Sequence, residues 1–413
     1  MHTFTYLFLA FLLASTLVQV YLSLRQKQHV SQHRSAVPDP FAGKVTLAEH
    51  QKAADYTLAK GSVGRIDLLL GLVILLVWTL GGGLDWLDKL WRSMGWSELY
   101  TGTAVIISLM LIGSLLEIPV SLYRTFVLEE RFGFNKMTPV MFVTDLLKGT
   151  ALTLLIGVPL VMLILWLMES AGSGWWLYAW AALTAFSLLM TWAYPKFIAP
   201  LFNKFSPLEE GEVAERLNAL LTRTGFNSKG VFVMDGSRRS AHGNAYFTGF
   251  GKNKRIVFFD TLLKHLTPAQ VEAVLAHELG HFKRKHILKG MVLSISMTLA
   301  GFALLAWLMQ QAWFYTSLGV SQPSTWMALV LFVLVSPIFT FFIGPLMAWW
   351  SRKHEFEADA FAAEQSSSAE LIAALVGLYR ENASTLTPDP LYSAFYDSHP
   401  PAAIRIAHLQ QRS

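Results

Sequence analysis

The 413-residue chain is 53% hydrophobic and only 15% charged, and its mean hydropathy is +0.42. These values exclude an ordinary soluble globular domain and favour a membrane protein. The chain contains no cysteine, which excludes disulfide bonds and thiolate metal ligands. Its net charge is +5, but the basic residues are concentrated in connections between apolar segments, so nucleic acid is not an expected partner.

Seven apolar segments approach the roughly twenty residues that a helix needs to cross the hydrocarbon core of a bilayer. The first could be mistaken for a signal peptide, but its apolar run is too long and no lysine or arginine precedes it. We therefore expect the lipid bilayer as a partner and seven membrane-spanning helices, at residues 4–24, 66–84, 101–123, 149–168, 175–194, 287–311 and 325–350.

The distribution of lysine and arginine predicts the orientation of the spans. The connection 25–65, in which a short helix is expected at 46–60, carries seven basic residues, whereas 169–174 and 312–324 carry none. Because positively charged connections tend to stay in the cytoplasm, the N-terminus is expected outside. The membrane would be the inner membrane of a bacterium or the endoplasmic reticulum membrane of a eukaryote.

This topology divides the chain into four expected parts. They are five spans with their connections (1–194), a cytoplasmic segment (195–286), two further spans (287–350) and a cytoplasmic C-terminal segment (351–413). The two cytoplasmic segments would lie in the same compartment. Residues from both can therefore contribute to one site.

Glu117 lies in the middle of the third predicted span. A carboxylate inside a membrane is costly and usually faces a polar cavity or a charged partner. Two interpretations remain open, a residue that lines a polar chamber and a buried structural ion pair.

Three short strands are expected in the segment 195–286, at Val231 to Met234, Asn244 to Phe250 and Arg255 to Asp260. The last two would be joined across residues 251–254. An exposed strand edge can hold an extended peptide through main-chain hydrogen bonds, so this small sheet is a candidate platform for a substrate.

The most informative motif is His277-Glu278-Leu279-Gly280-His281. Two histidines four residues apart on a helix share one face and can hold one zinc ion, and the glutamate between them can reach a water molecule there. Zinc lowers the pKa of such a water to about 7, so a neighbouring carboxylate can take its proton for amide hydrolysis. Thr267-Pro268-Ala269-Gln270 is typical of a helix start and supports this interpretation. The alternative is an amphipathic helix with two histidines at its polar edge.

A third ligand is expected from 351–413, on a helix that continues out of the seventh span. A catalytic zinc commonly takes two histidines and one glutamate. Glu355 and Asp359 share a helix face, which suits one ligand and one carboxylate that orients a ligating histidine, whereas Glu357 points about 200° away from Glu355. The alternative is a solvated acidic face. Three other histidines are not at ligand spacing and are expected to be surface or interfacial groups: His242, His265 and His286.

Four motifs together resemble the type I CAAX prenyl protease family, the membrane zinc metalloproteases of the sterile-mutant class. They are Asn244-Ala245-Tyr246-Phe247, His277-Glu278-Leu279-Gly280-His281, Glu355-Phe356-Glu357-Ala358-Asp359 and Ser398-His399-Pro400-Pro401. The resemblance covers most of the chain. It implies a mainly α membrane protein in which a barrel of seven transmembrane helices encloses a water-filled chamber. A cytoplasmic, gluzincin-like zinc-metalloprotease domain would contain a small β-sheet.

The resemblance also implies a role for each site residue. One zinc ion per chain would be held by three metal ligands, His277, His281 and Glu355. Glu278 would be the general base and later the proton donor, Asp359 would support the site, and His399 would stabilise the tetrahedral oxyanion. Asn244 would hold the substrate or the transition state from an edge strand, and Arg405 would lie close by as a second substrate-binding residue.

Three other functions fit parts of the sequence. A site-2-type intramembrane protease needs its zinc motif inside a span and an Asp-Gly pair in another, but Asp235-Gly236 lies in the 195–286 segment. A bacterial heat-shock membrane protease shares the zinc motif but typically has fewer spans and a shorter chain. In a bacterium without prenylation, the same enzyme would instead be a quality-control protease that acts on unprenylated peptides. A transporter or receptor explains the spans and ignores the metal ligands. The expected substrate is a peptide or protein, and its prenylation stays open because nothing in the sequence encodes an isoprenoid pocket.

Overall fold

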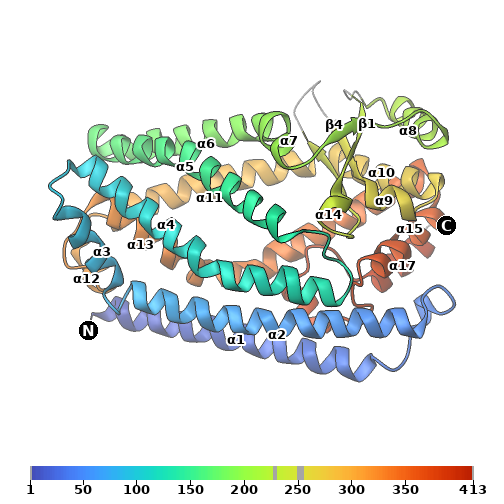
Figure 1. Cartoon of the computed structure of the whole chain (residues 1–413), viewed down its shortest axis with the longest axis horizontal. Helices are drawn as coiled ribbons and strands as arrows, with labels where there is room; N and C mark the ends of the chain where they lie inside the picture. The colour runs from blue at the N-terminus through green and yellow to red at the C-terminus, as the bar shows by residue number, and fades with distance from the viewer. Residues whose placement is uncertain (1, 227–229, 249–254, 412–413) are drawn as a thin grey trace.

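The computed structural model describes residues 2–226, 230–248 and 255–411. The long helices run side by side along the longest axis of the molecule (Figure 1). The N-terminus lies at one end and the C-terminus at the other, where the sheet and most of the short helices are gathered. We call the end of the molecule that holds the sheet and most of the short helices the C-terminal end.

The long helices are α1 (Thr3–His33), α2 (Leu47–Trp78), α4 (Glu98–Tyr123), α5 (Pro139–Ser170), α6 (Trp175–Ala193), α11 (His286–Leu308), α13 (Thr325–Thr340) and α14 (Gly344–Gln365). The short α-helices are α3 (Gly83–Arg92), α7 (Ala199–Phe202), α8 (Glu212–Arg223), α9 (Asp260–His265), α10 (Pro268–Lys283), α12 (Ala312–Thr316), α15 (Ser368–Glu381), α16 (Pro390–Tyr396) and α17 (Ala402–Gln410). Tighter or wider helical turns occur at η1 (Asp39–Phe41), η2 (Arg124–Glu129), η3 (Gly172–Gly174), η4 (Tyr194–Ile198), η5 (Gly236–Arg238) and η7 (Phe341–Ile343).

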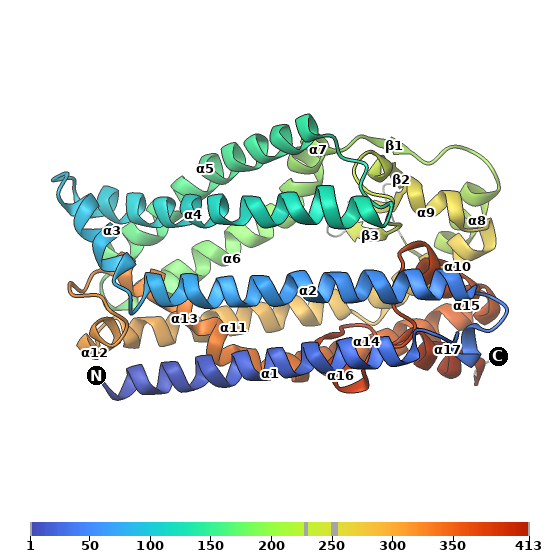
Figure 2. The same ribbon diagram turned by 60° about the horizontal axis from the view of Figure 1, so that its bottom comes forward.

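Seven stretches of helix in the described part of the chain are long and apolar enough to cross a membrane. Each overlaps one of the seven predicted segments, so the prediction of seven spans is confirmed. Large exposed apolar side chains such as Leu13, Ile66 and Leu155 lie along these helices, as expected of surfaces that contact lipid. Figure 2 shows α1, α2 and α4 side by side on one face of this array.

Helix α2 differs from the expected short helix at 46–60. It begins with a capping box between Thr46 and Glu49 and continues without interruption to Trp78. No proline occurs in this stretch to remove a backbone donor, so the helical hydrogen bonds continue through Gly61 and Gly64 into the apolar segment. The second span and the polar segment before it therefore form one continuous helix.

Helix α4 has open space on more than one side. Residues 113–117 are all exposed. Because successive residues of an α-helix are rotated by about 100°, five consecutive residues point in every direction around the axis. A helix with lipid on one side and a packed core on the other would bury part of this stretch. The exposure therefore agrees with the predicted chamber inside the ring of helices.

Glu117 belongs to this open stretch. Its side chain is 56% exposed, and its Oε1 atom lies 3.5 Å from Nη1 of Arg124, which also pairs with Asp67 of α2. The interpretation as a buried structural pair is wrong, since the carboxylate is accessible. Glu117 is instead part of an accessible charged group inside the spanning region.

The sheet has four strands in the order β1-β2-β4-β3, with β1 (Phe205–Pro207), β2 (Val231–Met234), β3 (Ala245–Thr248) and β4 (Arg255–Phe259). β2 and β4 are parallel, and β3 pairs antiparallel to β4 with Ala245 opposite Phe258. The three predicted strands are confirmed except at two ends, because Asn244 precedes β3 and Asp260 is the first residue of α9. Residues 249–254, including the predicted connection, lie outside the described residues. β1 and β3 are the two edge strands of the described sheet.

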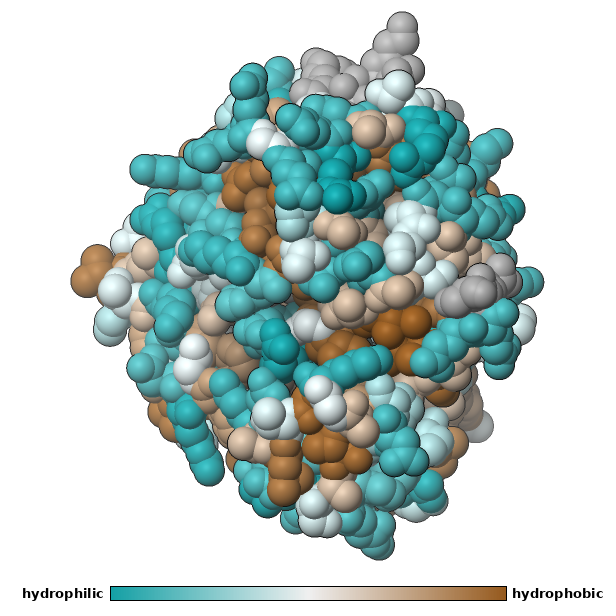
Figure 3. All heavy atoms as spheres, turned by 90° about the vertical axis from the view of Figure 1, so that its right-hand side faces the viewer, coloured by the Kyte–Doolittle hydropathy of each residue, from teal (hydrophilic) through white to brown (hydrophobic). Residues whose placement is uncertain are grey.

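The sheet and the short helices at the C-terminal end share one hydrophobic core. It joins segments that are far apart in sequence, represented by Phe41, Leu217, Phe258, Leu275 and Leu375. Figure 3 looks at this end, and hydrophilic side chains cover most of it. The C-terminal end thus has the apolar interior and polar surface of a water-facing domain attached to the spans.

Candidate metal centre

Helix α10 carries the zinc motif, His277 to His281. Thr267 Oγ1 accepts a hydrogen bond from Gln270 N, and Gln270 Oε1 accepts one from Thr267 N, so the predicted capping box is confirmed. The helix buries Leu275 and other apolar residues in the core of the C-terminal end. This burial fixes the rotation of α10 and leaves the two histidines on the side that packs along α14.

Gly280 allows α10 and α14 to approach closely. A Cβ atom at this position would lie 2.8 Å from Cα of Ala358 and 2.9 Å from the carbonyl oxygen of Ala358. Both atoms belong to the backbone of α14, so a larger residue would push the helices apart. The glycine inside the motif therefore brings Glu355 against the two histidines.

The three predicted ligands converge. One ligand atom from each of His277, His281 and Glu355 lies within 4.8 Å of the other two. The two Nε2 atoms are 3.3 Å apart. Nε2 of His277 is 3.4 Å from Glu355 Oε2, and Nε2 of His281 is 3.2 Å from Glu355 Oε1. The prediction that the tail supplies the third member of the cluster agrees with this geometry.

These residues fit a zinc ion. Glu355 is 3% exposed, and its Oε2 atom is buried without a hydrogen-bond partner. A buried polar atom without a partner is unfavourable, and a cation between the three side chains would remove that cost. Two imidazole nitrogens and one carboxylate oxygen are a donor set typical of catalytic zinc.

His277 is held by a buried ion pair. Its Nδ1 atom is 2.8 Å from Oδ1 of Asp359, which is completely buried. Arg405 donates to both oxygens of Asp359, from Nε at 2.8 Å and from Nη2 at 2.5 Å. Asp359 therefore fixes Nδ1 of His277 as the donor and leaves Nε2 facing the cluster. Arg405, predicted to bind substrate, is itself buried behind the ligands and orients Asp359.

Burial and hydrogen bonding shift the pKa of His277 in opposite directions. Burial and the nearby Arg405 charge oppose protonation of His277, but its hydrogen bonds to Asp359 and Glu355 outweigh them and raise the pKa of His277 to about 9. Burial raises the pKa of the Glu278 carboxyl, although the neighbouring histidines lower it. Glu278 is therefore a stronger proton acceptor than a solvated glutamate.

His281 is held differently, through a second histidine. Its Nδ1 atom is 3.1 Å from Nδ1 of His286, and Nε2 of His286 is 3.0 Å from Oε2 of Glu357. His286 also stacks on His354 with ring centroids 3.9 Å apart. The expectation that His286 is a surface or interfacial group is wrong, because it is 6% exposed and contacts a predicted ligand. Lys285, at φ +57°, turns the chain between α10 and α11 and returns His286 towards the motif.

His399 and Asn244 lie in different settings. Nε2 of His399 is 3.4 Å from Oε1 of Glu355, and the His399 side chain is 62% exposed, so it borders the cluster from the solvent side. Asn244 precedes the edge strand β3, and its Oδ1 atom accepts a hydrogen bond from Ala245 N. The adjacent Gly243 is fixed by two hydrogen bonds to Asn382.

The remaining two histidines agree with their expected surroundings. His242 stacks on Phe134 at a ring-centroid distance of 4.2 Å, and its Nε2 atom is 3.3 Å from Glu129. His265 is exposed and lies 3.5 Å from Glu381. Neither contacts the metal cluster in the interactions of the described residues.

Comparison with known families divides the chain into two matched regions. Residues 26–204 match the CAAX prenyl protease N-terminal family, described as five membrane helices. Residues 207–413 match peptidase family M48. The second match includes every predicted metal ligand.

Individual relatives match over nearly the whole chain. The sequence is 34% identical to a CAAX prenyl protease 1 homolog from Oryza sativa subsp. japonica, covering 97% of this chain and 96% of the relative. It is 33% identical to CAAX prenyl protease 1 from Saccharomyces cerevisiae, covering 97% and 93%. The crystal structure of S. mikatae Ste24p is similar with a TM-score of 0.91 and 32% sequence identity, and the match covers 99% of each chain.

Proposed function

This chain belongs to peptidase family M48 and is a multi-pass membrane metalloprotease that uses zinc, and from this premise we propose that it cleaves proteins with a C-terminal CAAX sequence. The observation that carries the proposal is the convergence of His277, His281 and Glu355, with one carboxylate oxygen of Glu355 buried and without a hydrogen bond. The alternative of a transporter or receptor does not explain this arrangement.

His277 and His281 would bind zinc through Nε2, and Glu355 through its carboxylate. When bound, zinc supplies Lewis acidity that polarises a carbonyl group and lowers the pKa of water to near 7. Asp359 and Arg405 keep the His277 ring in the orientation that points Nε2 into the cluster. Nη1 of Arg405 lies 3.5 Å from Oε2 of Glu355. We retain the prediction that this side of the Arg405 guanidinium contacts the substrate.

Glu278 would act as the general base. It lies on the same helix as the two histidines, and its raised pKa suits a carboxylate that takes a proton from the attacking water and returns it to the leaving amine. His399 borders Glu355 from the accessible side of the cluster, where it can donate a hydrogen bond to the oxygen that becomes negatively charged.

The edge strand β3 would align the substrate. Phe259 N donates to Asn244 O, so Asn244 and Phe259 form a hydrogen-bonded pair of the antiparallel ladder. Alternation along the strand then turns the C=O group of Ala245 and both the N–H and C=O groups of Phe247 towards the unpaired edge, where the N–H of Ala245 donates to Asn244 Oδ1. An extended peptide can add to this edge, with Asn244 at its end close to the bond to be cleaved.

We propose that the C-terminal end faces the cytoplasm, in the inner membrane of a bacterium or in the endoplasmic reticulum membrane of a eukaryote. The excess of basic residues in 25–65 over 312–324 supports this orientation. The proposed division is 1–194 and 287–350 for the spans and 195–286 and 351–413 for the catalytic part. The hydrophobic core that joins Leu217, Leu275 and Leu375 supports treating the last two segments as one unit.

Prenylation of the substrate is supported by two observations. The relatives are named for CAAX prenyl processing. The open stretch 113–117 of α4 also indicates space among the spans in which an apolar chain could lie. The alternative is a quality-control protease that accepts unprenylated peptides, and it differs only in whether the lipid contributes to recognition.

The test compares two peptides that differ in one group. A CAAX peptide with an S-farnesyl cysteine should be cleaved after that cysteine with a kcat/KM about tenfold or more above that of the S-methyl peptide, because burial of the isoprenoid adds binding energy. Glu278→Gln protein serves as the control for contaminating proteases. Equal cleavage of both peptides would favour the quality-control alternative, and cleavage of neither by zinc-loaded protein would overturn the proposed activity.

A further inference from the structure

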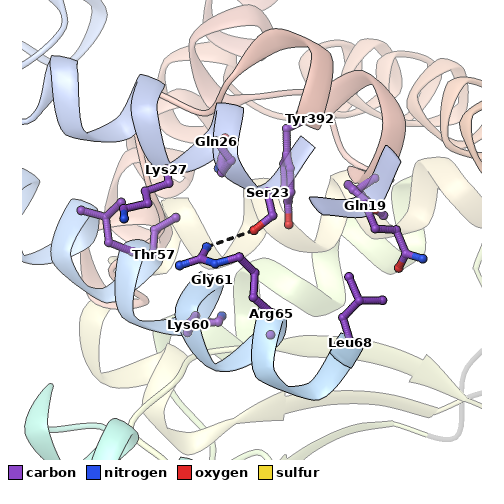
Figure 4. Close-up of a pocket in the computed structure, with 13 residues that line it drawn as sticks. Gln19, Ser23, Gln26, Lys27, Thr57, Lys60, Gly61, Arg65, Leu68 and Tyr392 are labelled. Atoms are coloured by element: carbon purple, nitrogen blue, oxygen red, sulfur yellow. Dashed lines mark hydrogen bonds between the residues drawn. The ribbon is translucent and has the colours of Figure 1, made fainter. Parts of the chain in front are cut away.

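A pocket separate from the metal cluster lies between α1, α2 and α16 (Figure 4). Its volume is about 370 Å³. Ser23 and Lys27 reach it from α1, Lys60 and Arg65 from α2, and Tyr392 from α16. None of the predicted metal ligands lines it.

All charged side chains that line the pocket are positive. Lys27, Lys60 and Arg65 contribute three cationic side chains, and the other lining residues are polar, aromatic or apolar without an aspartate or glutamate. Like charges gathered around one hollow repel one another and leave a positive potential inside it. An anion placed in the hollow would remove this repulsion.

Arg65 contrasts with the arginines near it. Arg25 pairs with Asp389 at 3.0 Å, and Arg34 pairs with Asp55 at 2.7 Å. Arg65 donates to two hydroxyl groups instead, Ser23 Oγ at 3.1 Å and Ser62 Oγ at 3.0 Å. Among the described residues no carboxylate lies within ion-pair distance of it. These hydroxyls fix the guanidinium across the gap between α1 and α2 without neutralising it, as Figure 4 shows for Ser23.

Two glycines line the pocket. Gly61 and Gly64 line it from the interior of α2, where glycine is less favourable than alanine. A Cβ atom at Gly64 would meet nothing within 4 Å, so close packing of the protein does not explain this glycine. Neither glycine adds a side chain to the space beside Arg65.

The pocket lies at a membrane boundary. The apolar segment 4–24 ends just before Lys27, and the segment 66–84 begins directly after Arg65. Exposed apolar side chains adjoin it on both helices, with Leu24 49% exposed and Ile66 57% exposed. A molecule bound there has a positive pocket for an anionic group and apolar helix faces for acyl chains.

We propose that this pocket binds the phosphate of an anionic phospholipid, with the guanidinium of Arg65 as the principal donor and Lys27 and Lys60 as further cations. Guanidinium and ammonium groups form strong charge-assisted hydrogen bonds with phosphate oxygens. Basic pockets between membrane helices at this depth suit lipid headgroups. The lipid phosphate and a free phosphate ion offer the same chemistry, so the experiment must separate them.

Native mass spectrometry of the full chain in detergent, with dioleoyl phosphatidylglycerol or dioleoyl phosphatidylcholine added, tests the proposal. The wild type should retain one phosphatidylglycerol about tenfold more tightly than phosphatidylcholine. Gly64→Leu should abolish this preference by filling the pocket. Gly71→Leu is the matched control, because Gly71 lies on the same helix, also has open space at its Cβ position and does not line the pocket.

A second pair of variants tests the charge. Arg65→Gln should weaken phosphatidylglycerol binding about tenfold, whereas Lys44→Gln removes an exposed charge from the same connection and should not. Glu278→Gln should bind lipid as the wild type does, which separates this proposal from the proposed hydrolysis. Unchanged binding in Gly64→Leu would overturn the proposal. Equally tight binding of inorganic phosphate alone, measured calorimetrically, would overturn the lipid part and assign the pocket to free phosphate.

Discussion

The two histidines of the zinc motif belong to one helix and point at one cluster, but the protein supports them in different ways. His277 contacts Asp359 through Nδ1, and Asp359 is completely buried and held by two hydrogen bonds from Arg405. His281 contacts His286 through Nδ1, and His286 in turn contacts the Glu357 side chain, which is 35% exposed. The first support is the buried ion pair of Asp359 and Arg405. The second is the neutral ring of His286, which is itself held by the partly exposed carboxylate of Glu357.

The difference indicates that the two supports contribute unequally to the metal site. A charge-assisted hydrogen bond inside the protein is shorter and stronger than a neutral one, and it also raises the basicity of the ligand. The His286 support, by contrast, begins at the first residue of α11 and so connects the motif to a membrane span. We expect the first support to dominate zinc affinity and the second to adjust it.

The largest effect should come from a change that touches neither support. Glu278→Gln should lower turnover by about 10²–10⁴-fold, because the amide cannot accept the proton of water. Zinc content should stay at that of the wild type, since both histidines keep their partners. Turnover and bound zinc are measured on one preparation. Wild-type turnover would mean that another group is the base.

The pH profile should report the same carboxyl. Because burial raises the pKa of Glu278, and because only its ionised form accepts a proton, kcat/KM should fall on the acidic side with a midpoint above the ordinary value of 4.5. Rates are measured from about pH 4 to about pH 8, with zinc content determined at each pH. A midpoint at or below the ordinary value would contradict the assignment.

Removing the stronger support tests the comparison directly. Asp359→Ala should weaken zinc binding about 10- to 100-fold and lower the free energy of unfolding by about 3–5 kcal/mol, because Arg405 is left buried without its partner. Chelator competition and unfolding of the zinc-free protein measure the two effects. Asp55→Ala is the control, since it breaks a similar pair with Arg34 in which both side chains are 40% exposed.

Removing the weaker support should have a smaller effect. His286→Phe can keep the stacking on His354 but leaves Nδ1–H of His281 without an acceptor, so zinc binding should weaken about tenfold. His242→Phe replaces another stacked histidine away from the cluster and should leave zinc binding unchanged. If His286→Phe weakened zinc as much as Asp359→Ala, the two supports would be equivalent and the comparison would fail.

The smallest effect is expected at the outer end of the second support. Glu357→Gln keeps an oxygen that can accept from Nε2–H of His286 and removes only a partly solvated charge, so zinc affinity should change by no more than about threefold. Competition with the same chelator measures this change. A loss of zinc in this variant would indicate that Glu357 is itself a ligand.

Local patterns in the sequence were sufficient for much of the molecule. The seven spans follow from apolar runs of sufficient length, because a bilayer imposes that length on any helix that crosses it. The cluster of His277, His281 and Glu355 follows from helical spacing and from donor chemistry. β2 and the start of β4 follow from short apolar runs between turn residues.

Only the tertiary structure decided what surrounds these elements. His286 has no ligand spacing, and the left-handed turn at Lys285 brings it beside His281. Arg405 reaches Asp359 across 46 residues of chain, and Gly280 matters because α14 passes against it. The pocket beside Arg65 depends on three helices that meet. Spacing within one helix fixes which side chains share a face, but it contains no information about which distant segment packs against that face.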